Sequence, residues 1–87
     1  MDRILPVITR LYKECRKQDS KWGEQNHDDF KWLAILGEEV GECNKAALEG
    51  KDDELIEELI QVAAVVHAII ESMDRNYEKE RINIKKS

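Results

Sequence analysis

The feature that most restricts the fold of this sequence is its apolar run from Leu59 to Ile70, which is interrupted only by Gln61 and His67. As a helix, this run would be apolar nearly all the way round, and its alanines would let other helices approach closely. A helix that is apolar on every side must be buried on every side. A chain of 87 residues can bury only a modest core of its own. The run therefore predicts a homo-oligomer built around this helix.

The length and composition indicate one small domain over residues 1–87. The apolar run is too short to cross a bilayer, which needs roughly 20 residues, and the first residues lack the apolar segment of a signal peptide. We therefore expect no membrane partner. Cys15 and Cys43 form no C-x-x-C pair, which argues against a zinc site and a disulfide framework. A cytoplasmic location is the simplest expectation.

The net charge of -5 is unevenly distributed along the chain. Residues 22–58 carry twelve acidic and three basic side chains, a local net charge of -9. Such an acidic segment repels a nucleic-acid backbone, so no nucleic-acid partner is expected. It suits a cation site, although most of these acids must be solvated. The basic side chains of the first predicted helix are interpreted as a solvated face, and they are Arg10, Lys13, Arg16 and Lys17.

The periodicity of apolar residues predicts an all-α fold. The expected elements are a helix over residues 3–19, a polar connection over 20–28, a second helix from an Asp28 or Asp29 N-cap to Gly50, and a third from Asp52 or Asp53 to about Met73. Because the link between the second and third helices is very short, these two helices should pack antiparallel. A charged tail is expected from about residue 75, either without helix or with one or two further helical turns.

Some acids of the second and third helices fall on apolar flanks. The predicted buried stripe of the second helix consists of Leu33, Leu36, Val40, Cys43 and Ala47. At about 100° per residue, Glu39 borders this stripe and Glu42 stands one turn further on, whereas Glu38 faces water. On the third helix, Glu58 falls among apolar positions and Glu57 lies closer to solvent.

Like-charged carboxylates that meet between packed helices are unfavourable unless a cation joins them. Carboxylate oxygens are ligands that Mg²⁺ prefers, and bound Mg²⁺ keeps waters that a phosphate can replace. The pattern therefore favours a Mg²⁺ site made of Glu39, Glu42 and Glu58. Periodicity alone leaves open the alternative that all three are surface acids.

The sequence resembles the MazG-like all-α nucleoside triphosphate pyrophosphohydrolases in Gly37-Glu38-Glu39-Val40-Gly41-Glu42, in Lys45-Ala46 and in Glu57-Glu58-Leu59-Ile60-Gln61-Val62. The signature of that family is Glu-Glu-x-x-Glu followed, after a variable gap, by Glu-x-x-Asp. Trp22 and His27 are similar to a Trp…His segment upstream of the signature in family members. The resemblance covers roughly residues 20–72.

The resemblance implies a four-helix-type bundle completed by oligomerisation, as a homodimer or homotetramer. It also implies cleavage of a nucleoside triphosphate between the α- and β-phosphates, with Mg²⁺ or Mn²⁺, into a nucleoside monophosphate and pyrophosphate. Carried over by position, Glu39, Glu42 and Glu58 would be catalytic metal ligands, and one of them could help to activate the attacking water.

Gln61 stands where the family signature has Asp. Its neutral carbonyl oxygen could still bind Mg²⁺ or a bound water, but it cannot supply a charge or act as a base. Alternatively, Gln61 faces a neighbouring subunit. Two further hypotheses remain open, namely a nucleotide- or metal-binding oligomer that has lost turnover, and a helical oligomer whose acids form only a charged surface.

Three more residues are candidates for substrate binding. Trp22 could stack on a base, and His27 could contact a base or phosphate, although either could merely anchor the loop. Lys45 could reach a phosphate, but its angle on the helix favours a solvent-facing ion pair with a nearby glutamate.

Overall fold

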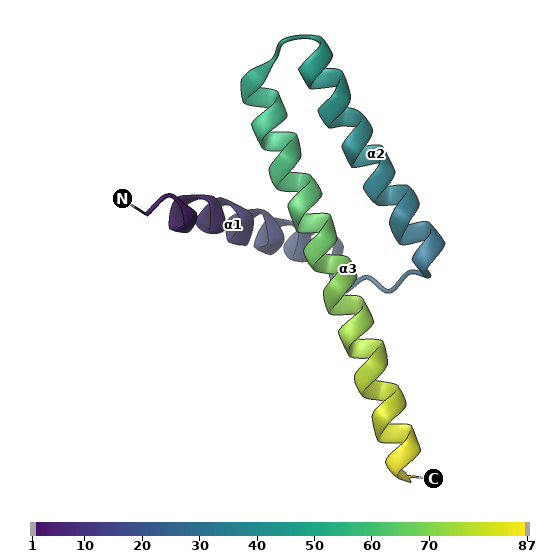
Figure 1. The fold of residues 1–87 in the computed structure, drawn as a ribbon. Coiled ribbons are helices and arrows are strands. Elements are labelled where there is room, and N and C mark those ends of the chain that lie inside the picture. The colour runs from purple at the N-terminus through teal and green to yellow at the C-terminus, as the bar shows by residue number, and fades with distance from the viewer. Residues whose placement is uncertain (1, 87) are drawn as a thin grey trace.

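The computed structural model describes residues 2–86, with side chains described as far as residue 79. Within that range the chain is helical and contains no strand, as predicted. The helices are α1 (Ile4–Trp22), α2 (Asp29–Leu48) and α3 (Asp52–Lys86). In the described range α1 and α2 both pack on α3 but not on each other. Figure 1 shows α2 antiparallel to the first half of α3, with α1 crossing behind α3.

Both ends of α2 have the capping residues that the sequence predicts. At the N-terminal end Asp28 is the cap, and its side chain accepts a hydrogen bond of 2.8 Å from the Lys31 N–H. At the other end Gly50 takes a left-handed φ of 69°. Its N–H donates to the Ala47 carbonyl at 3.1 Å, and the Lys51 N–H donates to the Ala46 carbonyl at 2.9 Å. This paired arrangement closes the last turn of α2 and reverses the chain at once.

The first helix is longer than predicted and ends at Trp22. Its stop is Gly23, which has φ 69° and whose N–H donates to the Asp19 carbonyl at 2.8 Å. No residue between Asp19 and Gly23 opposes a helix, so the polar composition of that segment was a misleading signal. Trp22, predicted in the connecting loop, is instead the last residue of α1. No residue of α1 is fully buried.

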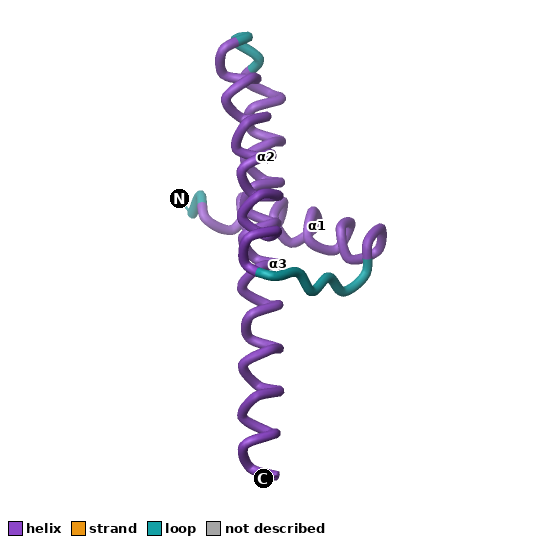
Figure 2. Tube along the Cα trace, turned by 90° about the vertical axis from the view of Figure 1, so that its right-hand side faces the viewer, coloured by secondary structure: helices purple, strands orange, loops and turns teal. Residues whose placement is uncertain are grey.

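The third helix runs to Lys86, so its predicted end near Met73 was too early. The segment after Met73 has neither Gly nor Pro, and its charged residues are good helix formers. The loss of apolar residues there marks the edge of the core rather than the end of the helix. Figure 2 shows the last part of α3 extending beyond the other two helices. No helix in the described range combines the length and the apolar character that a bilayer span needs.

The buried core lies between α2 and α3 and is small. Its apolar members are Trp32, Cys43, Ala46, Ala64 and Val65. The predicted stripe of α2 was therefore only partly right: Cys43 is buried, but Leu33 is 60% exposed and Val40 is 42% exposed. Helix α2 carries two overlapping stripes with three- and four-residue spacing, and a single chain buries only the stripe that faces α3.

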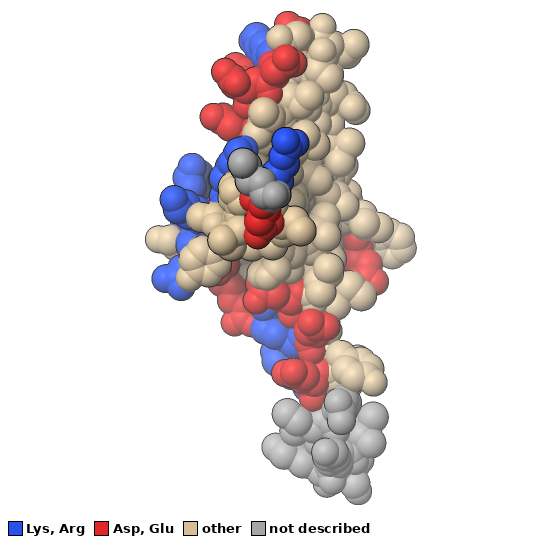
Figure 3. Space-filling view, turned by 60° about the vertical axis from the view of Figure 1, so that its left-hand side comes forward, with Lys and Arg blue, Asp and Glu red and all other residues tan. Residues whose placement is uncertain are grey.

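The second stripe contributes to a surface that we term the open apolar face. Its exposed members are Leu33 and Val40 of α2 and Leu59, Val66, Ile70, Met73 and Tyr77 of α3. On each helix these residues lie about 100° round the axis from those that meet the other helix. In an antiparallel pair this offset brings both stripes to the same side, opposite to α1. Figure 3 shows uncharged surface along one flank of the molecule.

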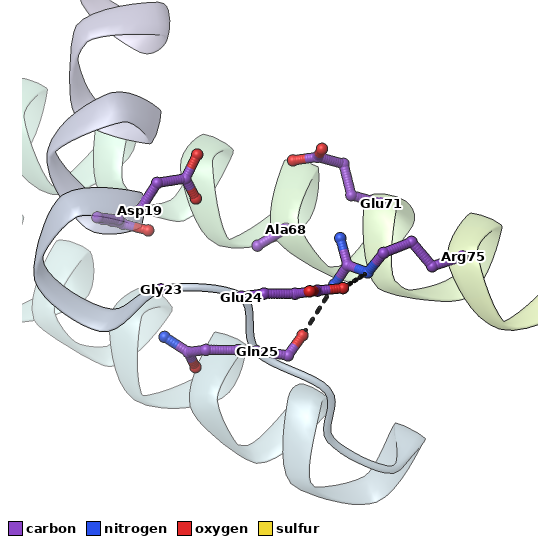
Figure 4. Close-up of a pocket in the computed structure, with 8 residues that line it drawn as sticks. Asp19, Gly23, Glu24, Gln25, Ala68, Glu71 and Arg75 are labelled. Atoms are coloured by element: carbon purple, nitrogen blue, oxygen red, sulfur yellow. Dashed lines mark hydrogen bonds and ion pairs between the residues drawn. The ribbon is translucent and has the colours of Figure 1, made fainter.

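The connection before α2 is held against α3 by Arg75 (Figure 4). The guanidinium donates to the Gln25 carbonyl at 3.0 Å and to the Asn26 side-chain oxygen at 3.2 Å, and it forms an ion pair with Glu24. The buried Ser72 hydroxyl also donates to Asn26, at 3.4 Å. These contacts place the start of α2 beside the middle of α3.

Replacing Gly50 with Ala should lower the free energy of unfolding by about 1 kcal/mol, because a Cβ disfavours the left-handed backbone at this position. Gly41→Ala is the matched control. Gly41 lies inside α2 with open space around its Cα, so alanine there should raise the free energy of unfolding by about 0.5–1 kcal/mol. Chemical denaturation at one fixed protein concentration measures both, and changes of the same sign would contradict this role of Gly50.

Candidate functional site

Two of the predicted site residues, Glu39 and Glu58, meet across the contact between α2 and α3. Both side chains are half-buried, and Glu39 lies on the stripe of α2 that packs against α3. The pKa of the Glu39 carboxyl is raised, first by its burial and then by the negative charge of Glu58 and a hydrogen bond shared with it. Weaker contributions come from Glu42 and Glu38. The fold thus brings two carboxyls together at the partly buried contact between α2 and α3.

The thiol of Cys43 is affected by the same negative charges. Cys43 is buried one turn along α2 from Glu39. Its pKa is raised mainly by burial, and further by the charges of Glu58 and Glu39. A thiol in this setting stays protonated, so Cys43 acts as an apolar core residue rather than as a thiolate ligand.

Glu42 approaches Glu58 from the side of the hairpin that α1 occupies. These two residues line a pocket of about 110 Å³ near the turn between α2 and α3, together with Lys45, Ala46, Glu49, Lys51 and Glu54. Lys51 is held by Glu49 at 3.1 Å and Glu54 at 3.9 Å. Lys45 is exposed and lines this pocket with Glu42 and Glu49, the two glutamates beside which its helical angle had placed it.

The three predicted metal ligands are adjacent, but their carboxylates do not point at one common position. Glu58 meets Glu39 at the helix contact and Glu42 in the pocket. Among the described residues, no group of three His, Cys, Asp or Glu side chains is arranged to hold a metal ion as it stands. Glu42 is exposed and free to change its rotamer. The oxygen donors and the excess of negative charge suit a hard divalent cation such as Mg²⁺.

Gln61 lies apart from the acidic pocket. It lines an open groove of about 820 Å³ between α1 and the first turns of α3. The basic residues Arg10, Lys13 and Lys17 line the same groove. All three bases are exposed, in keeping with the solvated face expected for them, and the structure adds that this face borders α3.

The structure does not bring Trp22 or His27 into the acidic pocket. Trp22 is 61% exposed at the end of α1, with the Lys21 ammonium 4.9 Å from its ring centre. His27 is half-buried and packs edge-on against Trp32 at 4.8 Å, while its Nε2 lies 3.0 Å from the Gln25 side-chain oxygen. Trp32 lies in the first turn of α2, about 15 Å along the helix from Glu42. Sequence reasoning missed Trp32, which is 3% exposed and whose indole N–H is buried without a partner.

A cysteine, a histidine and a glutamate also meet where α1 crosses α3. The Nδ1 of His67 lies 3.0 Å from Glu71 and 3.7 Å from the Cys15 sulfur. Both contacts use the same ring nitrogen, so the imidazole cannot relay a proton from the thiol to the carboxylate. The pKa of Cys15 is raised, chiefly by burial and then by nearby acids. This cluster therefore packs α1 against α3 and does not form a nucleophilic site.

In the absence of divalent cations, Glu39→Gln should raise the free energy of unfolding at neutral pH. Because folding raises the Glu39 pKa, the folded state binds more protons than the unfolded state. Stability should therefore decline as pH rises from about the ordinary value of 4.5 through the raised pKa. In the variant, the free energy of unfolding should decline less across this pH range, as measured by chemical denaturation at each pH. Glu38→Gln, at an exposed neighbour, is the control, and an equal loss of the decline in both variants would contradict the assignment.

The residues of the Glu-Glu-x-x-Glu run thus lie with Glu39 at the helix contact, Glu42 in the pocket and Glu38 toward solvent. Comparisons with protein-family models, with curated proteins and with solved structures found no match. What is established for the fold is an all-α arrangement in which α1 and α2 pack on α3.

Proposed function

We propose that this protein is a Mg²⁺-dependent nucleoside triphosphate pyrophosphohydrolase of the MazG-like kind. The observation that carries the proposal is the pair of Glu39 and Glu58, pressed together between two helices with Glu42 close by. Such a pair is favourable only when a proton or a cation offsets its charge. The signature spacing of these same acids supports a metal and a phosphate substrate as the partners.

Glu39, Glu42 and Glu58 would hold Mg²⁺, and Gln61 is a neutral candidate at the edge of the set. The bound ion would supply charge neutralisation at the triphosphate. In the reaction, a water oxygen forms a bond to the α-phosphorus while the bond from that phosphorus to the bridging oxygen of pyrophosphate breaks. A carboxylate of the chain accepts the proton of the water. Lys45, which lines the pocket with the acids, would contact a phosphate oxygen.

The proposed assembly is a homodimer in which a second copy covers the open apolar face. The exposed residues of α3 in this face recur at spacings of three, four and seven, which suits a lengthwise helix contact. The small core of one chain leaves a need for further burial. Two hairpins joined in this way form a four-helix bundle. This arrangement leaves the acidic pocket on the outer side, next to α1.

A second candidate function is nucleotide or metal binding without turnover. Gln61 favours it, because an amide cannot provide the charge that an aspartate would supply. Gln61 lines the groove beside α1 and not the acidic pocket itself. Stabilisation by Mg²⁺ and nucleotide without pyrophosphate release would identify this function.

A screen of nucleoside triphosphates with Mg²⁺ or Mn²⁺ should detect pyrophosphate release from at least one nucleotide. Glu58→Gln should reduce that release by about a hundredfold or more, because it removes a charged ligand from the centre of the set. Glu38→Gln, which changes an exposed acid of the same run, should retain near-normal turnover. Full activity in the Glu58 variant, or none in the unmodified protein, would refute the enzyme proposal.

Replacing Ile70 with Glu should convert the dimer to a monomer at micromolar concentration, because it places a charge within the open apolar face. Leu48→Glu is the matched control, since Leu48 is 89% exposed and lies outside that face. Light scattering after size-exclusion chromatography gives the mass of each species. This interface would be ruled out if the unmodified protein were monomeric, or if its dimer persisted after the Ile70 change. A tetramer of the unmodified protein would show that a further surface also associates.

A further inference from the structure

The groove between α1 and the start of α3 is lined by side chains of both charges. Helix α1 contributes Arg10, Lys13, Glu14 and Lys17, and α3 contributes Asp53, Ile56, Glu57, Ile60 and Gln61. Figure 3 shows acidic side chains toward the tip of the hairpin and basic side chains below them on the same flank. The groove is large enough, at about 820 Å³, to take part of a nucleotide.

The bases of this groove are available to a ligand. Arg10, Lys13 and Lys17 follow one another at spacings of three and four, which places them on one side of α1. Among the side chains that the structure describes, none of the three lies within ion-pair distance of a carboxylate; the ion pairs formed are those of Lys51, His67 and Arg75. Cations that line a groove without internal partners favour an incoming anion.

The groove and the acidic pocket adjoin along the first turns of α3, where the residues that line one alternate with those that line the other. Glu58 lines the pocket, and Gln61, one turn further along α3, lines the groove. Both lie on the side that α1 occupies, opposite to the open apolar face. A phosphate chain held at Glu58 by a metal could therefore extend past Gln61 toward the bases of α1.

We infer that this groove is the subsite for the pyrophosphate half of the substrate, with Lys13 and Lys17 binding the β- and γ-phosphates. The assignment rests on the proposed function for the identity of the phosphate chain as part of a nucleotide. Gln61 donates its amide N–H to a phosphate oxygen, which gives this position a use that does not need a carboxylate. The acids on the α3 side suit a phosphate chain that carries Mg²⁺, because such a ligand presents charge of both signs.

The test compares a double variant, Lys13→Ala with Lys17→Ala, against a matched double variant, Arg16→Ala with Lys21→Ala. The control removes the same charge from α1 but from residues outside the groove. The first readout is the affinity of inorganic tripolyphosphate with Mg²⁺, measured by calorimetry. The groove variant should bind it about tenfold more weakly, and the control should change little.

The second readout is kinetic, with any nucleotide that the protein hydrolyses. In the groove variant, KM should rise about tenfold and inhibition by pyrophosphate should weaken, whereas inhibition by the nucleoside monophosphate should stay unchanged. All four substituted side chains are exposed, so the melting temperature should hold in both variants and a folding defect can be recognised.

The outcomes separate this inference from the proposed function. If the groove variant turns over substrate with the same KM and the same inhibition by pyrophosphate as the unmodified protein, the subsite is overturned and the enzyme proposal stands. Equal weakening in both variants would overturn it as well, because general charge attraction would then suffice. A change in oligomeric mass confined to the groove variant would assign the groove to a second copy. Tripolyphosphate binding that only the groove variant loses, in a protein without turnover, would support the subsite and refute the enzyme.

Discussion

The packing of both other helices on α3 is the constraint on which this structure depends. Helices α1 and α2 have no contact with each other in the described range, so their relative position is set by where each meets α3. The tight turn at Gly50 aligns α2, and the Arg75 contacts align the loop that leads from α1 to α2. The contacts that each helix makes with α3 therefore determine where the acids of α2 lie relative to the bases of α1.

The two sides of the α2–α3 hairpin differ in chemistry. One side carries the open apolar face, and the other carries the acidic pocket and the groove of α1. Glu39 and Glu58 lie at the contact between these sides, where burial and mutual repulsion combine. A carboxyl pair at such a boundary lies close to packed apolar surface while a ligand can still reach it from the polar side.

Much of the local structure could be predicted from the sequence, because caps and turns are set by single residues. The N-cap of α2 was predicted at Asp28 or Asp29 and its terminal glycine at Gly50 from position alone, and the antiparallel hairpin followed from the short link. The end of α1 was placed too early even though Gly23 follows it, because the polar residues before Gly23 suggested a loop, and the end of α3, which has no such glycine, was also placed too early. The buried face of α2 was only partly predicted, because Leu33 and Val40 belong to a second stripe that one chain leaves exposed.

The candidate site also has a part that the sequence predicted and a part that it could not predict. Helical angles selected Glu39 over Glu38, and the structure places Glu39 against Glu58. The groove beside Gln61 could not be predicted, because it depends on the angle at which α1 crosses α3, which no pattern within either helix encodes. The position of Lys45 beside the acids likewise depends on how the hairpin turn folds the acids of α3 back toward α2.

The dependence of α1 on α3 has a consequence for the order of folding. The hairpin closes a loop of a few residues, so its contacts carry little entropic penalty. The contact between Arg75 and Gln25 joins residues 50 positions apart, and the contact between Cys15 and His67 joins residues 52 apart. Helix α1 is synthesised first yet has no tertiary partner until α3 has been made. We therefore expect α1 to dock after the hairpin has closed, and the groove that it borders to form with that step.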